Sequence, residues 1–257
     1  MLVRAVIRRV RSVAAVQRSR RSGQESPGGG GWGAARWTGL SGLTMCVLLV
    51  PAIALETVGP DSSTSPKLVA SDFAAARDSV LVSGALFLVA MGVGLVFVSG
   101  VTSLAHRQPE APLARVASAS GLLGIAVFST YAASFAAIAA SIGELREHQT
   151  LTYAVFRVSS AIDDGSGLFI AIFVASIAYP LVRMGLGSPW VARLGVVAAL
   201  VRAVGVLDIT TLGAWPFGPF MVVGTLLCVL WLLLTSLSLL HAGTARLPDL
   251  GRPIPET

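Results

Sequence analysis

Residues Val80–Leu104 read VLVSGALFLVAMGVGLVFVSGVTSL, a stretch of 25 residues without a charged side chain. A helix of about 20 apolar residues crosses the hydrocarbon layer of a membrane, because it rises about 1.5 Å per residue. Lipid cannot hydrogen-bond to exposed backbone groups, so an apolar segment of this length must be helical in a membrane. The stretch therefore predicts a transmembrane helix.

Five further apolar segments have the same character, and short polar connections separate them. Together the sequence predicts an all-α fold, a polytopic membrane bundle with six transmembrane helices over residues 40–241. A basic cytoplasmic segment with a Gly-rich linker, residues 1–39, and a short cytoplasmic tail, residues 242–257, would flank this bundle. The other predicted spans are Leu40–Val58, Val116–Gly143, Gly165–Val182, Val191–Leu212 and Phe217–Leu240.

The N-terminal 39 residues have two predicted parts. In Met1–Gln17 apolar residues recur at helical spacing with arginines between them, which is typical of an amphipathic helix on an anionic membrane surface. The alternative is a functionless extension translated from an upstream start. Ser22–Ala35 is rich in glycine and predicts a flexible linker.

Composition supports a membrane protein and argues against other classes. Only 12% of the 257 residues are charged, against about 25% in soluble domains. The net charge of +6 does not indicate a nucleic-acid partner, because the arginines are not interleaved with exposed aromatic residues. A single lysine among 19 basic residues and the absence of asparagine indicate a GC-rich, bacterial genome. Cys46 and Cys228 lie in apolar segments and are predicted to be packing residues, not a disulfide.

The distribution of basic residues predicts the topology. The N-terminal stretch, the second and fourth connections and the C-terminal tail together hold 14 basic residues, whereas the opposite side holds four. Cytoplasmic loops carry the excess of lysine and arginine. We therefore predict that both termini are cytoplasmic and that the protein lies in the bacterial cytoplasmic membrane.

Charged residues inside or beside the predicted spans mark the candidate site. These are Glu56, Asp163, Asp164, Arg202 and Asp208. A charge at the middle of a membrane costs roughly 2.5–3.5 kcal/mol, so Arg202 is expected near the bilayer midplane with a partner or a water-filled cavity. One interpretation is a polar pocket that all five line. The alternative is a structural ion pair of Arg202 with Glu56 or Asp208, with Asp163 and Asp164 capping the start of the fourth span.

Small residues and tryptophans predict how the spans pack. Rows at four-residue spacing predict close packing of the third to fifth spans, and the bulkier sixth span is expected to face lipid. Trp190, Trp215 and Trp231 are candidate anchors at the membrane surface, and the first two lie at predicted span ends. The rows are Ala132, Ala136 and Ala140; Ala133, Ala137 and Ser141; Gly167, Ala171 and Ala175; and Gly195, Ala199 and Ala203.

The sequence contains no H-E-x-x-H, G-x-S-x-G or P-loop motif, so we predict no catalytic residue, no cofactor and no metal ligand. The first functional hypothesis is a non-enzymatic structural or partner-binding component of the envelope. Its partners would be the lipid bilayer and either another membrane protein or a second copy of the chain. The alternative is a transporter or binding protein for a small molecule or lipid, with a polar pocket around Arg202 and Asp208.

Two segments carry a family resemblance. Pro189-Trp190 leading to Leu194-Gly195 resembles the Pro-x-Trp-Leu-Gly start of a span in uncharacterised actinobacterial multi-pass membrane proteins, although here the tryptophan directly follows the proline. The ending LWLLLTSLSLL, Leu230–Leu240, is similar too. The resemblance covers roughly Leu40 to Leu240 and implies a six-span membrane protein, without implying a role for any residue.

Overall fold

The structure is a computed structural model, and Ala34–Thr257 is a unit separate from Met1–Gly33. Within the described residues every regular element is an α-helix, so the predicted all-α fold is confirmed. The residues that the structure describes are 30–56, 65–106, 111–145, 147–207 and 218–244.

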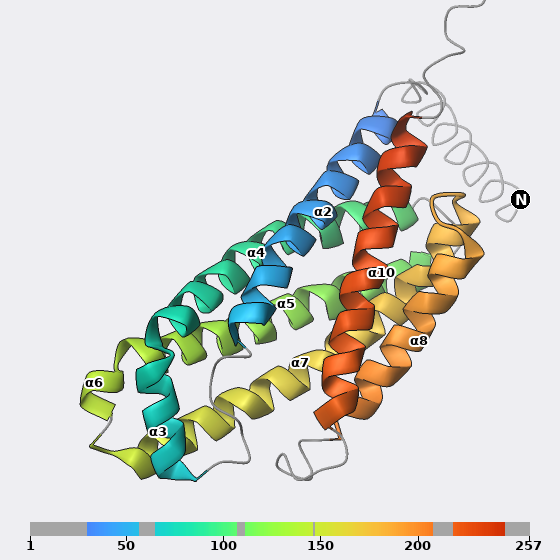
Figure 1. Ribbon diagram of the computed structural model, residues 1–257. Coiled ribbons are helices and arrows are strands. Elements are labelled where there is room, and N and C mark those ends of the chain that lie inside the picture. Colours follow the sequence, from blue (N-terminus) through green and yellow to red (C-terminus); the bar gives the residue numbers. More distant parts are fainter. Residues whose placement is uncertain (1–29, 57–64, 107–110, 146, 208–217, 245–257) are drawn as a thin grey trace, which may run out of the picture. The chain divides into compact units, whose positions relative to one another are not determined.

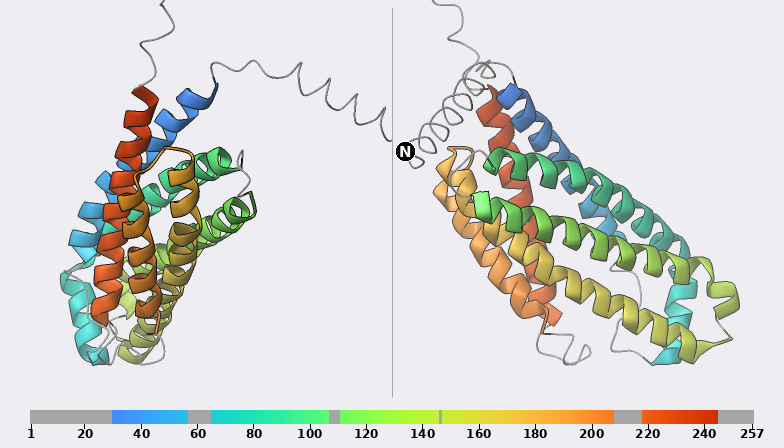
Figure 2. Two further views of the ribbon diagram at one scale, coloured as in Figure 1. Left: turned by 90° about the vertical axis from the view of Figure 1, so that its right-hand side faces the viewer. Right: turned by 180° about the vertical axis from the view of Figure 1, so that it is seen from behind.

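The long helices run back and forth, each antiparallel to the next (Figures 1 and 2). The short helices α3 (Pro66–Ala75) and α6 (Ile142–Leu145) lie at the end of the bundle where α4 and α7 begin and α5 ends. The long helices are α2 (Gly30–Glu56), α4 (Arg77–Ala105), α5 (Ala111–Ala140), α7 (Gln149–Arg183), α8 (Pro189–Gly205) and α10 (Gly218–Thr244).

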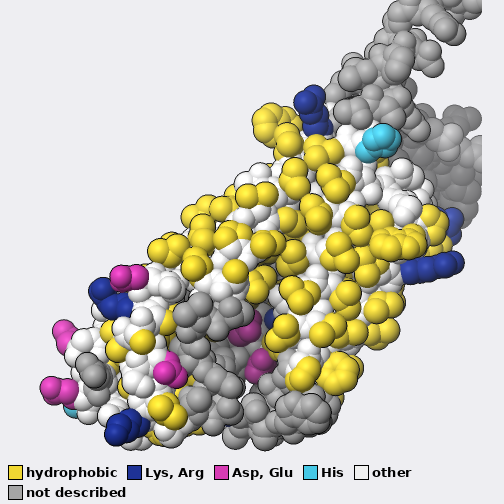
Figure 3. Space-filling view, viewed as in Figure 1, with side chains coloured by type: hydrophobic (Ala, Val, Ile, Leu, Met, Phe, Trp, Pro, Cys, Tyr) yellow, Lys and Arg dark blue, Asp and Glu magenta, His cyan; other side chains and the backbone are white. Residues whose placement is uncertain are grey.

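Five of the long helices are long and apolar enough to cross a membrane, namely α2, α4, α5, α7 and α10. Apolar side chains cover the middle of the face shown in Figure 3, and charged side chains gather toward its two ends. The chain is therefore a membrane protein. Helix α8, which corresponds to the predicted span Val191–Leu212, has 17 residues and is only about 25 Å long, whereas the hydrocarbon layer is about 30 Å thick. That α8 also crosses the membrane therefore stays a prediction.

Glycines allow neighbouring helices to approach closely. A Cβ atom built on Gly84 of α4 would lie 2.8 Å from the Cβ of Ala136 on α5. One built on Gly195 of α8 would lie 2.8 Å from Cδ1 of Trp231 on α10. Small residues at helix contacts are the usual means of packing in membranes, since lipid provides no hydrophobic drive between helices.

The predicted packing faces are partly confirmed. Gly167 and Ala171 of α7 are buried, as are Gly195 and Ala199 of α8. The row Ala133, Ala137 and Ser141 is wrong, because all three residues are exposed, and the last residue of two other rows, Ala140 and Ala175, is exposed too. Only one side of α5 is needed for its contacts with α4 and α7, so the other small residues are left on the outside.

Trp231 also departs from expectation. It is 1% exposed, and its ring packs edge-to-face against Phe173 of α7, with 6.3 Å between ring centroids. The indole fits inside the bundle because Gly195 has no side chain to exclude it. The sixth predicted span therefore has a buried face, and Trp231 is not a surface anchor.

Two apolar clusters form the core. The larger joins all six long helices and includes Phe97, Phe173 and Trp231. The smaller cluster has residues from α3, α4, α5, α6 and α7. It includes Phe73, Phe135 and Phe156, whose ring centroids are 5.1–6.2 Å apart. Both α5 and α7 contribute to the two clusters.

The predicted third connection, Glu144–Asp164, is wrong. Helix α7 begins at Gln149, so the helix that was expected to start at Gly165 begins 16 residues earlier, which adds about four turns at its N-terminal end. Its first half folds as a helix because Thr152, Phe156 and Ser159 recur at helical spacing and are buried, with Phe156 in the smaller cluster.

The ends of two other predicted spans also need correction. Helix α2 begins at Gly30, so the last residues of the predicted linker are helical. Helix α8 ends at Gly205, where the predicted span continues to Leu212. Arg202 therefore lies in the last turn of α8, not near its middle. The predicted helix Met1–Gln17 lies outside the described residues.

Candidate functional site

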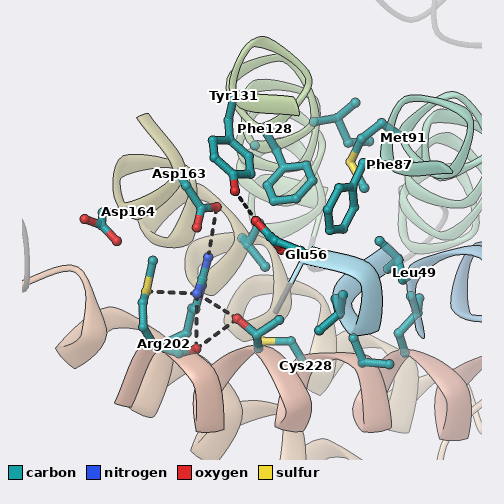
Figure 4. A pocket seen from close by; sticks show the side chains of 18 of the residues that line it. Leu49, Glu56, Phe87, Met91, Phe128, Tyr131, Asp163, Asp164, Arg202 and Cys228 are labelled. Atoms are coloured by element: carbon teal, nitrogen blue, oxygen red, sulfur yellow. Dashed lines mark hydrogen bonds and ion pairs between the residues drawn. The ribbon is translucent and has the colours of Figure 1, made fainter. Parts of the chain in front are cut away.

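A cavity of about 520 Å³ lies between the two apolar clusters. Side chains from α2, α4, α5, α7, α8 and α10 line it. Most of its wall is apolar, with aromatic rings and flexible methionine side chains on several sides (Figure 4). The apolar lining includes Met45, Leu49, Phe87, Met91, Phe128 and Phe173.

One part of the wall is polar, and charged groups from three helices meet there (Figure 4). Helix α2 ends with Glu56, α7 contributes Arg157, Asp163 and Asp164, and α8 contributes Arg202. The C-terminal end of α2 and the last turn of α8 thus face the middle of α7. This arrangement requires α7 to be continuous through residues 157–164, which the sequence had indicated to be a loop.

Arg202 is held by α10 and α7. Its Nη1 atom donates hydrogen bonds to the carbonyl oxygen of Met221 at 3.2 Å and to Oγ1 of Thr225 at 2.7 Å, and contacts Met221 Sδ at 2.8 Å. Its Nη2 atom lies 3.7 Å from Oδ1 of Asp163. The residue is 4% exposed, so its charge is satisfied almost entirely by the protein.

Two glycines make room for this arginine. A Cβ atom on Gly167 of α7 would lie 2.8 Å from Nε of Arg202, and one on Gly224 of α10 would lie 2.8 Å from its Cα atom. The guanidinium group therefore packs against α7 at Gly167, which has no side chain, and the backbone of α8 contacts α10 at Gly224. These contacts fix α7, α8 and α10 to one another at the polar end of the cavity.

Glu56 is bound by Tyr131 of α5, whose hydroxyl group donates a hydrogen bond to Oε1 of the carboxyl group (Figure 4). The bond joins the last residue of α2 to the middle of α5. Beside it Ser83 of α4 donates a hydrogen bond of 2.9 Å to the carbonyl oxygen of Ala52. The end of α2 is therefore attached to both α4 and α5 by polar contacts.

The two aspartates of α7 have different surroundings. Oδ1 of Asp163 is buried and accepts no hydrogen bond from the described residues, although Arg202 lies within ion-pair distance. The Asp163 side chain as a whole is 28% exposed. Asp164 also lines the cavity, but it points away from Arg202 and Glu56 (Figure 4).

The structure brings together four of the five candidate residues, Glu56, Asp163, Asp164 and Arg202, on one cavity wall. Asp208 lies outside the described residues. The capping interpretation of Asp163 and Asp164 is wrong, because both lie in the middle of α7. Among the described residues the ion-pair partner of Arg202 is Asp163, whereas the sequence had suggested Glu56 or Asp208.

Sequence reasoning missed the neutral partners of the charged residues. Tyr131 is the one tyrosine within Val116–Gly143, and a hydroxyl group in an apolar span was a signal that could have identified it. Thr225 and Met221 gave no such signal, because threonine and methionine are ordinary residues of membrane helices. Met221 binds Arg202 partly through its backbone, which no side-chain pattern reveals.

Comparisons with family models, with curated proteins and with solved structures found no match for this chain. The residues themselves must therefore indicate the chemistry of the cavity. Among the described residues no group of three or more histidine, cysteine, aspartate or glutamate side chains is placed to hold a metal ion. Instead, the cavity combines a long apolar wall with a small number of ionisable groups at one end.

Proposed function

We propose that this protein binds a small amphipathic molecule within the membrane, in the cavity between α2, α5, α7 and α10. The observation that supports the proposal is a cavity of about 520 Å³ with apolar walls and charged side chains at one end. Binding sites for small molecules have volumes of about 300–1,000 Å³ and are mostly apolar with a few polar groups. Such a cavity suits a ligand with an apolar body and a polar head.

The buried arginine supports this function without occupying the cavity. Its contacts with Met221, Thr225 and Asp163 stabilise the polar end of the wall, while the ligand would lie beside them. An ion pair that joins helices and a binding site can therefore coexist. The structural or partner-binding role that the sequence suggested first stays a prediction, and the cavity favours the alternative.

For the topology we propose six spans in a bacterial cytoplasmic membrane, with α8 as the sixth and both termini in the cytoplasm. In support, Arg36, Arg115, Arg183 and Arg193 lie near the helix ends opposite the polar end of the cavity. Excess arginine is typical of cytoplasmic loops. The polar end of the cavity would then lie toward the external surface.

Fusions to alkaline phosphatase test this topology, because the enzyme is active only outside the cytoplasm. We expect no activity from fusions at the N-terminus or after Thr257, and high activity from one inserted after Ser65, before α3. Full activity at either terminus would contradict the proposed orientation. A fusion to a cytoplasmic reporter at the same three positions should give the reverse pattern.

Ligand binding can be tested by protection of a thiol placed in the cavity. The variant Ser160→Cys, combined with Cys46→Ala and Cys228→Ser, carries its one cysteine in the cavity wall. In phosphatidylcholine vesicles we expect its reaction with N-ethylmaleimide to slow when octyltrimethylammonium, octyl glucoside or octanesulfonate is added. A matched Ser71→Cys variant, exposed on α3, should react at the same rate throughout.

A bulky residue in the cavity wall should weaken this protection. Ala161 lines the cavity and its side chain is exposed, so Ala161→Trp adds an indole there with little strain. We expect about a tenfold rise in the amphiphile concentration that gives half protection, equivalent to losing about 1.4 kcal/mol of binding. Ala154→Trp, two turns earlier on α7 and also exposed, is the control. Lack of protection by all three compounds, or equal effects of both tryptophans, would contradict the proposed function.

A further inference from the structure

The charged side chains of the cavity differ in how many of their possible hydrogen bonds and ion pairs the protein already provides. Three acidic and two basic side chains line the cavity among the described residues. The guanidinium group of Arg202 is committed to Met221, Thr225 and Asp163. Arg157 also has an interaction partner. Both arginines therefore already have partners in the protein, so a ligand with an anionic head would have to displace these contacts in order to bind them.

The carboxyl groups have more remaining capacity. A carboxylate has about four lone-pair sites for hydrogen bonds or ion pairs. Among the described residues Glu56 receives a hydrogen bond from Tyr131, and the Asp163 side chain has a contact with Ser166 and an ion pair with Arg202 at the long distance of 3.7 Å. Oδ1 of Asp163 accepts no hydrogen bond from the described residues although it is buried. A positively charged group between α2 and α7 would satisfy both side chains.

Aromatic rings surround the same position. Phe128 packs against Tyr131 and Phe87, with centroid distances of 5.5 and 5.1 Å. Tyr131 packs against Phe135, and Phe135 against Phe156, at 5.5 and 6.2 Å. All five rings line the cavity. The faces of aromatic rings attract cations, and clusters of such rings are typical of sites for quaternary ammonium groups.

We infer that the cavity selects amphipathic organic cations, with an alkylammonium head between Glu56 and Asp163 against the aromatic rings and an apolar tail along α2, α4 and α10. The inference rests on the proposed function and specifies its ligand class. The tail would contact Met45, Leu49 and Met91, whose flexible or branched side chains adapt to varied apolar shapes. A cation gains here both from carboxylates in a medium of low dielectric constant and from the ring faces.

The thiol-protection assay measures this selectivity directly, because the three octyl compounds share an apolar tail and differ in the charge of the head. Vesicles of phosphatidylcholine carry no net surface charge, so the lipid itself does not favour either ion. We expect half protection of Ser160→Cys at about a tenfold lower concentration of octyltrimethylammonium than of octyl glucoside. Octanesulfonate should protect least.

The variant Glu56→Gln tests the role of the carboxylate. Glutamine keeps an oxygen that accepts the hydrogen bond from Tyr131 but removes the negative charge. We expect it to reduce the preference for the cation severalfold while protection by octyl glucoside persists. Glu144→Gln, exposed on α6 and away from the cavity, is the matched control and should change neither.

The outcomes separate the two proposals. Equal protection by all three heads, or strongest protection by octanesulfonate, would overturn the cation selectivity while supporting the binding cavity. Protection by none would overturn both. Selectivity in the wild-type cavity that survives Glu56→Gln unchanged would overturn the assignment of the head site. The comparison of the three octyl compounds uses the unaltered cavity charges, so it decides the selectivity even where Glu56→Gln fails to fold.

Discussion

Replacement of Arg202 by alanine is expected to lower the free energy of unfolding by about 3–5 kcal/mol. The change removes the ion-pair partner of Asp163 and the hydrogen bonds that Arg202 donates to Thr225 Oγ1 and to the carbonyl oxygen of Met221, which keeps only its hydrogen bond from Thr225 among those that side chains donate. Breaking a buried pair by removing one member has this cost, because the remaining charge stays buried and uncompensated. Unfolding in mixed micelles with increasing sodium dodecyl sulfate, followed by circular dichroism, measures the loss.

Arg193→Ala is the matched control for this prediction. Arg193 lies on the same helix, but its side chain is exposed. Its replacement should change the free energy of unfolding by less than about 0.5 kcal/mol. The loss in the free energy of unfolding for Arg202→Lys should lie between those of the two alanine variants. An ammonium group lacks the forked geometry that allows one arginine to contact both α7 and α10. Equal stability of the two alanine variants would show that the contacts of Arg202 do not hold the helices.

The second large effect is expected at Gly224. A Cβ atom there would lie 2.8 Å from Cα of Arg202 and 2.9 Å from its backbone nitrogen. Backbone atoms cannot turn aside as a side chain can, so Gly224→Leu must push α8 away from α10. Overpacking of this kind typically costs about 1–3 kcal/mol, and the loss of the Arg202 hydrogen bonds adds to it.

Gly92→Leu is the control for Gly224→Leu, because a Cβ atom on Gly92 would meet no atom within 4 Å. The same unfolding assay should show little change for this variant. The double variant with Arg202→Ala and Gly224→Leu should cost less than the sum of the two single changes, since both remove the same contacts. Strict additivity would mean that Gly224 acts independently of the arginine.

The helices were predictable where hydrophobicity alone determines them. Val80–Leu104 contains no charge, and α4 covers it completely. The first half of α7 was not predictable in this way, because Arg157, Asp163 and Asp164 lower its hydropathy to that of a loop. Its helical signal is the spacing of the buried residues Thr152, Phe156 and Ser159, of which Phe156 packs with residues of α3 and α5. A short stretch of this kind becomes recognisable only when its packing partner is known.

The charged residues of the site could be predicted from the sequence, but the residues that they contact could not. Charged residues are rare in apolar segments, so Glu56 and Arg202 stood out in the sequence. Their partners depend on which helices are neighbours, and the sequence does not state this. Asp163 was assigned to a helix start and therefore not considered as the partner of Arg202. The aromatic rings of the cavity gave no signal, since phenylalanine is as ordinary in a packed core as in a binding site.

The length of α7 determines which membranes suit this protein. Its 35 residues span about 52 Å, whereas the hydrocarbon layer is about 30 Å thick, so roughly 20 Å of the helix extends beyond the layer or is accommodated by tilt. The N-terminal end of α7 lies beside α3 and α6, and charged residues gather there: Lys67 on α3, Arg77 at the start of α4 and Glu144 on α6. A thicker bilayer would draw these charges toward hydrocarbon at a cost of a few kcal/mol each. We therefore expect hydrophobic mismatch to limit how thick a membrane this end of the chain tolerates.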